Sequence, residues 1–178
     1  MSEKFHILAI DPGPTQSGWC ELDAHRVRAC GVLHNAQMLE RVRSTEAPVL
    51  AIEMIASYGM PVGREVFETC VWIGRYQQAW SKPDAVRLVF RKEVTMHLCG
   101  SARAKDPNVR QALIDLFPAT GGGATPQIGT KGRPGPLYGV SSHAWPALGV
   151  AVTVWNALAR LQGLPLRAPV NDMLAEAA

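Results

Sequence analysis

Residues 7–19 read Ile-Leu-Ala-Ile-Asp-Pro-Gly-Pro-Thr-Gln-Ser-Gly-Trp, and the rest of the architecture can be worked out from them. Four apolar residues lead to Asp11, a Pro/Gly turn follows, and residues 17–22 return as a second short segment. This pattern predicts a buried strand that ends at Asp11, a tight turn and an antiparallel partner. A carboxylate at the end of a buried strand is costly to desolvate unless a cation or hydrogen-bond donors compensate it. A turn-capping Asp is the alternative, because Asp-Pro-Gly is ordinary turn chemistry.

A second apolar strand also ends on an acid. Residues 49–52 read Val-Leu-Ala-Ile and are followed by Glu53. The segment comes after an expected helix over 36–43, so we expect it to be parallel to its neighbour and to lie inside the sheet. Two apolar strands that each end in a carboxylate are a less ordinary coincidence than one.

The remaining elements complete an α/β pattern. We expect a strand over 26–33, a helix over 65–80, a strand over 86–90, a helix over 106–117, a mobile loop over 118–139 and a helix over 142–162. Residues 66, 67, 70, 71 and 74 recur at helical spacing and predict the packed face of the 65–80 helix. Asp106 is the expected N-cap of its helix, with Pro107 at the first position. The order predicts a single domain over 1–162, with a mixed sheet flanked by helices, and a loosely held tail over 163–178.

Composition limits the class of protein. The chain has 178 residues, 47% of them hydrophobic, and a net charge of +3, so we expect one soluble domain with one sizeable core. No apolar run approaches the ~20 residues of a membrane span, and no signal peptide is evident, which predicts a cytoplasmic protein without membrane partners. The four cysteines form no CxxC pair and are expected to be reduced thiols. A zinc site on His97 and Cys99 lacks a partner pair.

Basic residues gather in two regions. The middle of the chain and a later glycine-rich loop hold Arg87, Arg91, Lys92, Arg103, Lys105, Arg110, Lys131 and Arg133. Acidic residues are sparse there. Such a distribution suits a polyanion, and a solvated charged face is the alternative.

Three motifs in this order resemble the RuvC-type Holliday junction resolvases of the RNase H-like nucleases. The first is Ile-Leu-Ala-Ile-Asp-Pro-Gly with Gly18, the second is Leu-Ala-Ile-Glu ending at Glu53, and the third is the helix start His-Ala-Trp-Pro-Ala-Leu-Gly-Val-Ala at 143–151. Residues 53–76 and the Gly-Pro-Leu-Tyr-Gly at 135–139 look most like the compact phage-encoded branch. The resemblance covers roughly residues 5–160. It implies an RNase H-like sheet of three antiparallel and then two parallel strands, in a bacterial or phage-encoded homodimer that cleaves four-way or other branched DNA.

The resemblance also implies a metal-dependent reaction. Two divalent cations ~4 Å apart can clamp a scissile phosphate, one generating hydroxide and the other stabilising the leaving 3′-oxygen. Asp11 would bridge both ions, Glu53 would hold one, and His143 matches a position where the family carries Asp or, in some members, His. Hard ions such as Mg²⁺ take oxygen ligands, and an imidazole also suits Mn²⁺. No other small-molecule cofactor is expected.

Pro146 departs from the family pattern. The familiar enzymes carry a further Asp there, one helical turn beyond the His143 position, and proline cannot bind a metal. Proline is tolerated in the first turn of a helix, where the N–H groups have no intrahelical partner, so the departure threatens activity more than fold. Glu65 and Asp106 are the nearest candidates to compensate.

Further roles follow from the same resemblance. Lys105 matches a basic residue close to the scissile phosphate, or is simply solvated, and Thr95 stands where the family often has another lysine. Tyr58 lies where resolvases extend an aromatic side chain toward the junction, where it could stack on a base or pack within its loop. Arg64 beside it joins the expected DNA contacts. One face of the 65–80 helix, with Trp72 and Tyr76, is the expected dimer interface.

Two other classes remain open at this point. An RNase H-like module that binds branched DNA without cutting would explain Pro146. An actin-like or sugar-kinase-type phosphotransferase would use Asp11, Gly13 and Thr15 as a phosphate loop, although such proteins generally need two domains of this kind to enclose a nucleotide.

Overall fold

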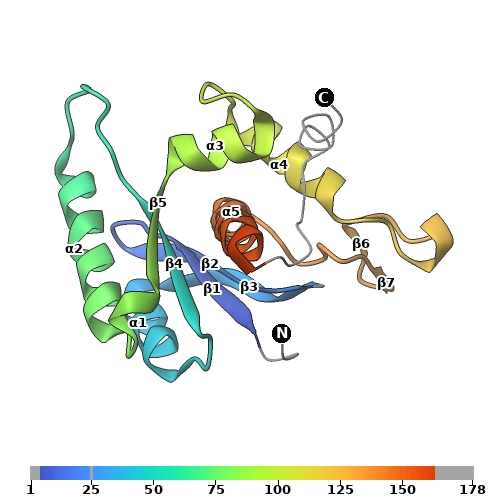
Figure 1. Ribbon diagram of the computed structural model, residues 1–178, viewed down its shortest axis with the longest axis horizontal. Coiled ribbons are helices and arrows are strands. Elements are labelled where there is room, and N and C mark those ends of the chain that lie inside the picture. Colours follow the sequence, from blue (N-terminus) through green and yellow to red (C-terminus); the bar gives the residue numbers. More distant parts are fainter. Residues whose placement is uncertain (1–4, 25, 163–178) are drawn as a thin grey trace.

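The computed structural model describes residues 5–24 and 26–162, and the expected tail over 163–178 lies outside them (Figure 1). Its five-stranded sheet has the order β3-β2-β1-β4-β5. The strands are β1 (His6–Asp11), β2 (Gln16–Asp23), β3 (Val27–His34), β4 (Val49–Met54) and β5 (Val86–Phe90). The first three are antiparallel, and β4 runs parallel to both β1 and β5. The predicted sheet of three antiparallel and two parallel strands is confirmed.

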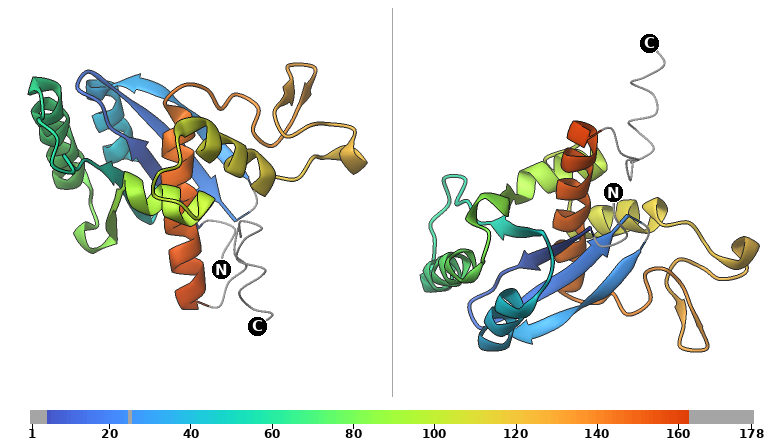
Figure 2. Two further views of the ribbon diagram at one scale, coloured as in Figure 1. Left: turned by 90° about the horizontal axis from the view of Figure 1, so that it is seen from above. Right: turned by 60° about the horizontal axis from the view of Figure 1, so that its bottom comes forward.

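Helices cover both faces of the sheet. They are α1 (Asn35–Ser44), α2 (Arg64–Ala79), α3 (Arg91–Cys99), α4 (Asp106–Leu116) and α5 (Ala144–Gln162), with short 3-10 turns at Pro83–Ala85 and Gly121–Gly123. Helices α1 and α2 lie on one face, and α5, flanked by α3 and α4, lies on the other (Figures 1 and 2). No helix in the described part of the chain is long and apolar enough to cross a membrane.

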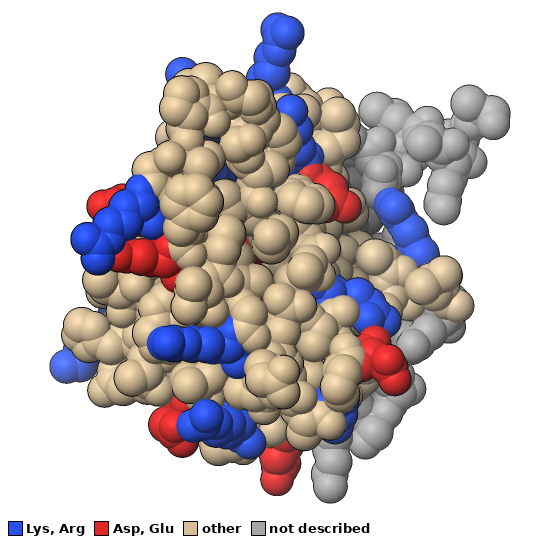
Figure 3. Space-filling model, turned by 90° about the vertical axis from the view of Figure 1, so that its left-hand side faces the viewer, with Lys and Arg blue, Asp and Glu red and all other residues tan. Residues whose placement is uncertain are grey.

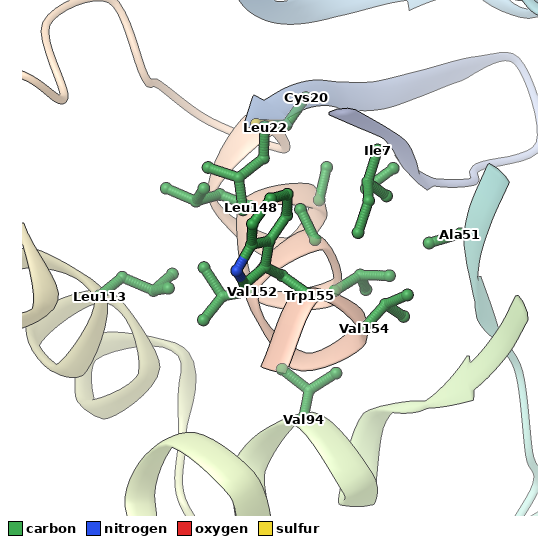
Figure 4. Close-up of a cluster of buried hydrophobic side chains, with 14 of the residues drawn as sticks. Ile7, Cys20, Leu22, Ala51, Val94, Leu113, Leu148, Val152, Val154 and Trp155 are labelled. Atoms are coloured by element: carbon green, nitrogen blue, oxygen red, sulfur yellow. The ribbon is translucent and has the colours of Figure 1, made fainter. Parts of the chain in front are cut away.

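The apolar run at the start of β1 is explained by burial on both faces. Ile7 and Ala9 point into the core beneath α5, whereas Leu8 and Ile10 point into the core beneath α1 and α2. Side chains alternate across a strand, so a strand between two helical layers needs apolar residues at every position. The buried stripe of the last helix consists of Leu148, Val152, Trp155 and Ala159, and Figure 4 shows Leu148 beside Leu22 of the sheet and Val152 on the side toward Leu113 of α4.

The predicted packing face of α2 was wrong. Phe67 is 62% exposed and Val71 is 54% exposed, whereas Thr69, Ile73 and Tyr76 face the sheet. The helix carries apolar residues on two faces, so its sequence pattern alone could not identify the inner one. Tyr76 is fully buried and its hydroxyl lies 3.0 Å from the Ser17 hydroxyl. It therefore cannot form the dimer interface expected of it.

The structure also differs from the prediction in two segments expected to be irregular and in the starts of two helices. Helix α3 was not predicted, because the apolar side chains it buries are few, namely Val94 and Leu98. The expected mobile loop at 118–139 contains a small hairpin of β6 (Gly129–Thr130) and β7 (Arg133–Pro134). Lys105, not Asp106, is the N-cap of α4. Helix α5 begins at Ala144 instead of Ser142, whose positive φ of 44° is not helical.

Candidate active site

The two strand-end acids emerge side by side. Strands β1 and β4 pair in parallel with Ile10 opposite Ile52, so the next residues, Asp11 and Glu53, leave the sheet at the same edge. The residues that precede the two acids, 7–10 and 50–52, are apolar and fully buried. Asp11 also pairs with Gly18 of β2. The parallel register thus converts two distant sequence motifs into one acidic centre.

His143 reaches this centre from the other helical layer. Its Nδ1 lies 3.3 Å from Oδ2 of Asp11, although 132 residues separate them in the sequence. Gly18 allows the approach, because a Cβ there would overlap the carbonyl oxygen of His143. The glycine of the first motif therefore allows the backbone at the start of the third motif to come close to β2.

A buried network of polar side chains fixes the turn after Asp11. The Asn35 side chain donates to the carbonyl oxygen of Gly13 at 2.9 Å, and the Ser17 hydroxyl donates to Asn35 Oδ1 at 2.8 Å. Tyr76 closes the network through Ser17. Sequence reasoning missed Asn35 and Ser17 as supports of the site, since nothing local distinguishes them from ordinary polar residues near turns.

Burial perturbs both acids. Desolvation raises the pKa of Glu53 to about 7, with a further increase from the neighbouring charge of Asp11 and a decrease from Arg91. Desolvation also raises the pKa of Asp11, opposed by its charge interaction and hydrogen bond with His143. Two mutually repelling acids held out of water are poised to gain from a bound cation.

A second charged pair adjoins the acids. Arg91, the first residue of α3, places Nη1 3.9 Å from Glu53 Oε2, and its Nη2 contacts a carboxylate oxygen of Asp106 at the start of α4. Asp106 in turn raises the pKa of both Asp11 and Glu53 through its charge. The fold therefore brings Asp106 near the centre, though bound to Arg91.

Three hollows meet at these residues. A cavity of about 380 Å³ is lined by Asp11, His143 and Glu65 among others. Glu65, like Asp106 a candidate to compensate for Pro146, therefore also borders the site. One of about 190 Å³ is lined by Asp11, Glu53, Tyr58 and Arg91. Another of about 360 Å³ opens between Arg91 and His143, over Trp145 and Pro146.

The donor set suits a divalent cation. Two carboxylates and an imidazole are ligands of Mg²⁺ or Mn²⁺, and Glu53 Oε2 is buried without a hydrogen-bond partner among the described residues. Across residues 5–24 and 26–162, however, no three His, Cys, Asp or Glu side chains already converge as a metal site. His143 and Arg91 instead face the carboxylates, so the ligands must reorient around an ion.

The other predicted residues surround the site at different distances. Tyr58 is half-exposed, and the Lys92 ammonium lies 3.8 Å from its ring centroid. The guanidinium of Arg110 lies 5.1 Å from the centroid of the Trp145 ring, at the mouth of one hollow. Arg103 and Lys105 are exposed before α4. Arg64 pairs with Glu68 at 2.6 Å on the outer side of α2, and Lys131 and Arg133 are exposed on the β6–β7 hairpin, away from the site (Figure 1).

Comparison with known proteins agrees with this architecture. No protein-family model and no curated protein matches the chain. Among solved structures, Thermus thermophilus RuvC is similar with a TM-score of 0.62 at 18% identity, over 89% of this chain and 97% of that one. Thermus thermophilus RuvC in complex with a Holliday junction substrate gives 0.61 at 19% identity, over 89% and 96%. The chain therefore has a RuvC-like fold, a form of the RNase H-like architecture.

Proposed function

We propose that this protein is a metal-dependent endonuclease that cleaves four-way junctions or related branched DNA. The observation that carries the proposal is that Asp11 adjoins both other predicted ligands at one edge of a RuvC-like sheet, Glu53 on the neighbouring strand and His143 at 3.3 Å. These residues come from three separate motifs, and two of them are acids whose pKa is raised by burial. A similar structure, that of Thermus RuvC, was solved with a Holliday junction, which supports branched DNA as the substrate class. A role in DNA recombination or repair would follow from this activity.

Asp11, Glu53 and His143 would hold Mg²⁺ or Mn²⁺, with the two ions of the resemblance as the starting expectation. Bound metal would supply Lewis acidity and an activated water for phosphodiester hydrolysis. The chain's own residues do the rest. Asn35 and Ser17 fix the turn that carries Asp11, and β4 fixes Glu53. The buried edge of the sheet limits water access to the carboxylates, which strengthens their attraction for a cation.

The basic and aromatic residues around the site would bind the DNA. Lys92 and Arg110 lie beside the hollows and suit phosphates on either side of the scissile bond. Tyr58, half-exposed and next to Lys92, suits stacking on an unpaired base, worth ~1–3 kcal/mol. Lys131 and Arg133 on the hairpin would reach a more distant part of a branch. Figure 3 shows the α2 side of the molecule, where charges of both signs are scattered, so this side does not offer a continuous basic surface.

A homodimer would supply the two active sites that symmetric junction cleavage needs. The exposed apolar residues of α2, Phe67 and Val71, together with Met60 and Val62 just before the helix, are the best candidates for the interface. We call these four residues the α2 apolar strip. Contiguous exposed apolar surface on a soluble protein commonly marks an interaction site. The strip replaces the expected contact through Trp72, which packs partly buried against the core, and Tyr76, which faces inward.

The test is cleavage of end-labelled four-way junction, flap and linear duplex DNA in Mg²⁺ and in Mn²⁺. We expect nicks in the junction, little cutting of the duplex, and no cutting by Asp11→Asn, which keeps the shape of the side chain but loses the charge. Binding without cutting in both metals would favour the non-catalytic module. If the protein neither bound nor cut the junction, the proposed nuclease function would be wrong.

A further inference from the structure

Arg91 lies inside the acidic centre instead of on the surface around it. Its side chain is 27% exposed, with Nη1 facing Glu53 and Nη2 on Asp106. Nη1 and Glu53 Oε2 are both buried, and neither has a hydrogen-bond partner among the described residues. Arg91 also contributes to lowering the pKa of Asp11 and Glu53. It therefore acts as a resident cation for these carboxylates, whereas Lys92 and Arg110 are exposed.

The backbone fixes this position. Strand β5 pairs with β4 so that Phe90 lies opposite Met54, and Arg91 follows at once. The Phe90 N–H donates to the Glu93 carboxylate at 2.7 Å, which anchors the first turn of α3. The contact of Asp106 holds the guanidinium from the other side. Because a guanidinium keeps its charge at any ordinary pH, this positive charge is permanent.

The charges of the centre limit how many metal ions it can take. Asp11, Glu53 and Asp106 with Arg91 carry a net charge of minus two when the acids are ionised. One divalent cation neutralises that charge, and a second would leave the buried centre strongly positive. A second ion near Glu53 and Asp106 would also be repelled by the guanidinium at short range. The carboxylate of Asp106 is already engaged by Arg91.

We propose that Arg91 takes the place of a second metal ion. On this account, which rests on the proposed function, the chain holds one divalent cation between Asp11, Glu53 and His143, in place of the two that the resemblance implies. The guanidinium stabilises negative charge on the scissile phosphate and on the leaving 3′-oxygen. A water oxygen bonds to phosphorus as the P–O3′ bond breaks. The attacking water releases one proton to solvent and the leaving 3′-oxygen takes one proton from solvent, because the guanidinium does not release one.

The first test counts ions without DNA. Mn²⁺ is titrated into the protein at pH 8 by calorimetry, with the bound ion followed by electron paramagnetic resonance. We expect one Mn²⁺ per wild-type chain and two per Arg91→Gln chain, since that variant frees Glu53 and Asp106 from the guanidinium. Arg87→Gln is the matched control, because Arg87 is exposed on β5 and its guanidinium donates to the carbonyl oxygens of Asp84 and Val86; it should keep one ion.

Two ions in the wild type would overturn the inference and leave the proposed nuclease standing. If the wild type bound no ion, both the inference about Arg91 and the proposed metal-dependent nuclease would be wrong. The number of Mn²⁺ ions bound per wild-type chain is decisive alone, so the test remains valid even if the Arg91→Gln variant folds poorly.

The second test separates chemistry from DNA binding. Under single turnover at saturating Mn²⁺, Arg91→Gln should cleave about 10²–10³-fold more slowly, the loss typical of removing one preorganised charge-stabilising group. Arg91→Lys should recover part of the rate, and the junction affinity of both should stay within about tenfold of Arg87→Gln. An unchanged single-turnover rate in Arg91→Gln would contradict the assigned role.

Discussion

At the scale of single residues, Glu53 gives the clearest link between burial and stability. Its pKa rises from 4.5 to about 7 on folding, so the folded protein binds this proton more tightly than the unfolded chain does. The stabilising effect of the proton is complete below pH 4.5 and is lost as pH rises through about 7. The free energy of unfolding should fall over this window by on the order of 3 kcal/mol without metal.

Glu53→Gln should remove this decrease in the free energy of unfolding with rising pH. We expect the variant to match the wild type near pH 4.5 and to be more stable at pH 8 in a chelating buffer, measured by urea unfolding across the window. Glu46→Gln, an exposed carboxylate outside the site, is the control and should follow the wild type. Parallel curves for Glu53→Gln and the wild type would show that the buried carboxyl is not perturbed as described. Mg²⁺ should restore wild-type stability at pH 8, since the ion binds the ionised form.

The acids and the histidine could be predicted from sequence, while their partners could not. Asp11 and Glu53 each end an apolar strand, and His143 begins a strongly apolar helix, so each has a local signal. Arg91 was predicted only as a basic residue for DNA, and Asp106 as a helix start and a candidate to compensate for Pro146. Their pairing depends on where α3 and α4 begin in space, which no short motif records.

At the scale of elements, the approach of β2 to the start of α5 is the most demanding contact. A Cβ at Gly18 would overlap the His143 backbone, so Gly18→Ala must push α5 or β2 aside. We expect a loss of about 1–3 kcal/mol in the free energy of unfolding and about 10²-fold in cleavage rate, since a shift near 1 Å at a site has that effect. Urea unfolding and single-turnover cleavage would measure both.

Gly31→Ala on the neighbouring strand is the matched control. Its Cβ would meet the nearest atom, Trp19 Nε1, at 3.4 Å, an ordinary van der Waals contact. This variant should retain stability and activity. Equal tolerance of both substitutions would mean that His143 is not held against β2 as described.

The β6–β7 hairpin makes a separate prediction about DNA affinity. Lys131→Gln with Arg133→Gln should weaken junction binding and reduce the slope of log affinity against log salt by about two, one for each lost phosphate contact. Thermal stability should not change, because both side chains are exposed. Fluorescence anisotropy at several salt concentrations would measure the slope. An unchanged slope would remove the hairpin from the DNA interface.

The elements themselves show where pattern reading succeeds. Strands β1 and β4 and helix α5 have one dominant apolar pattern and were predicted correctly. Helix α2 has two, because Phe67 and Val71 are exposed opposite the buried Ile73 and Tyr76. Helix α3 has almost no apolar pattern. Sequence periodicity identifies a helix, but only packing decides which of two apolar faces is inside.

At the scale of the whole molecule, the α2 apolar strip predicts the oligomeric state. Phe67→Glu with Val71→Glu should convert a dimer into a monomer in light scattering, and should leave stability intact since both side chains are exposed. Met96→Glu, which charges an exposed apolar position on α3, should remain dimeric. A dimer that persists in the double variant would place the interface elsewhere.

At the same scale, the proposed nuclease activity of Asp11, Glu53 and His143 should be visible on an intact branched substrate. The most direct measurement is the treatment of a supercoiled plasmid with an extruded cruciform, in Mg²⁺ and in Mn²⁺. Paired cuts across the junction would convert the plasmid to linear DNA, and Asp11→Asn would leave it supercoiled; this is the predicted result. A wild-type protein that binds the cruciform but leaves it uncut in both metals would contradict the claim.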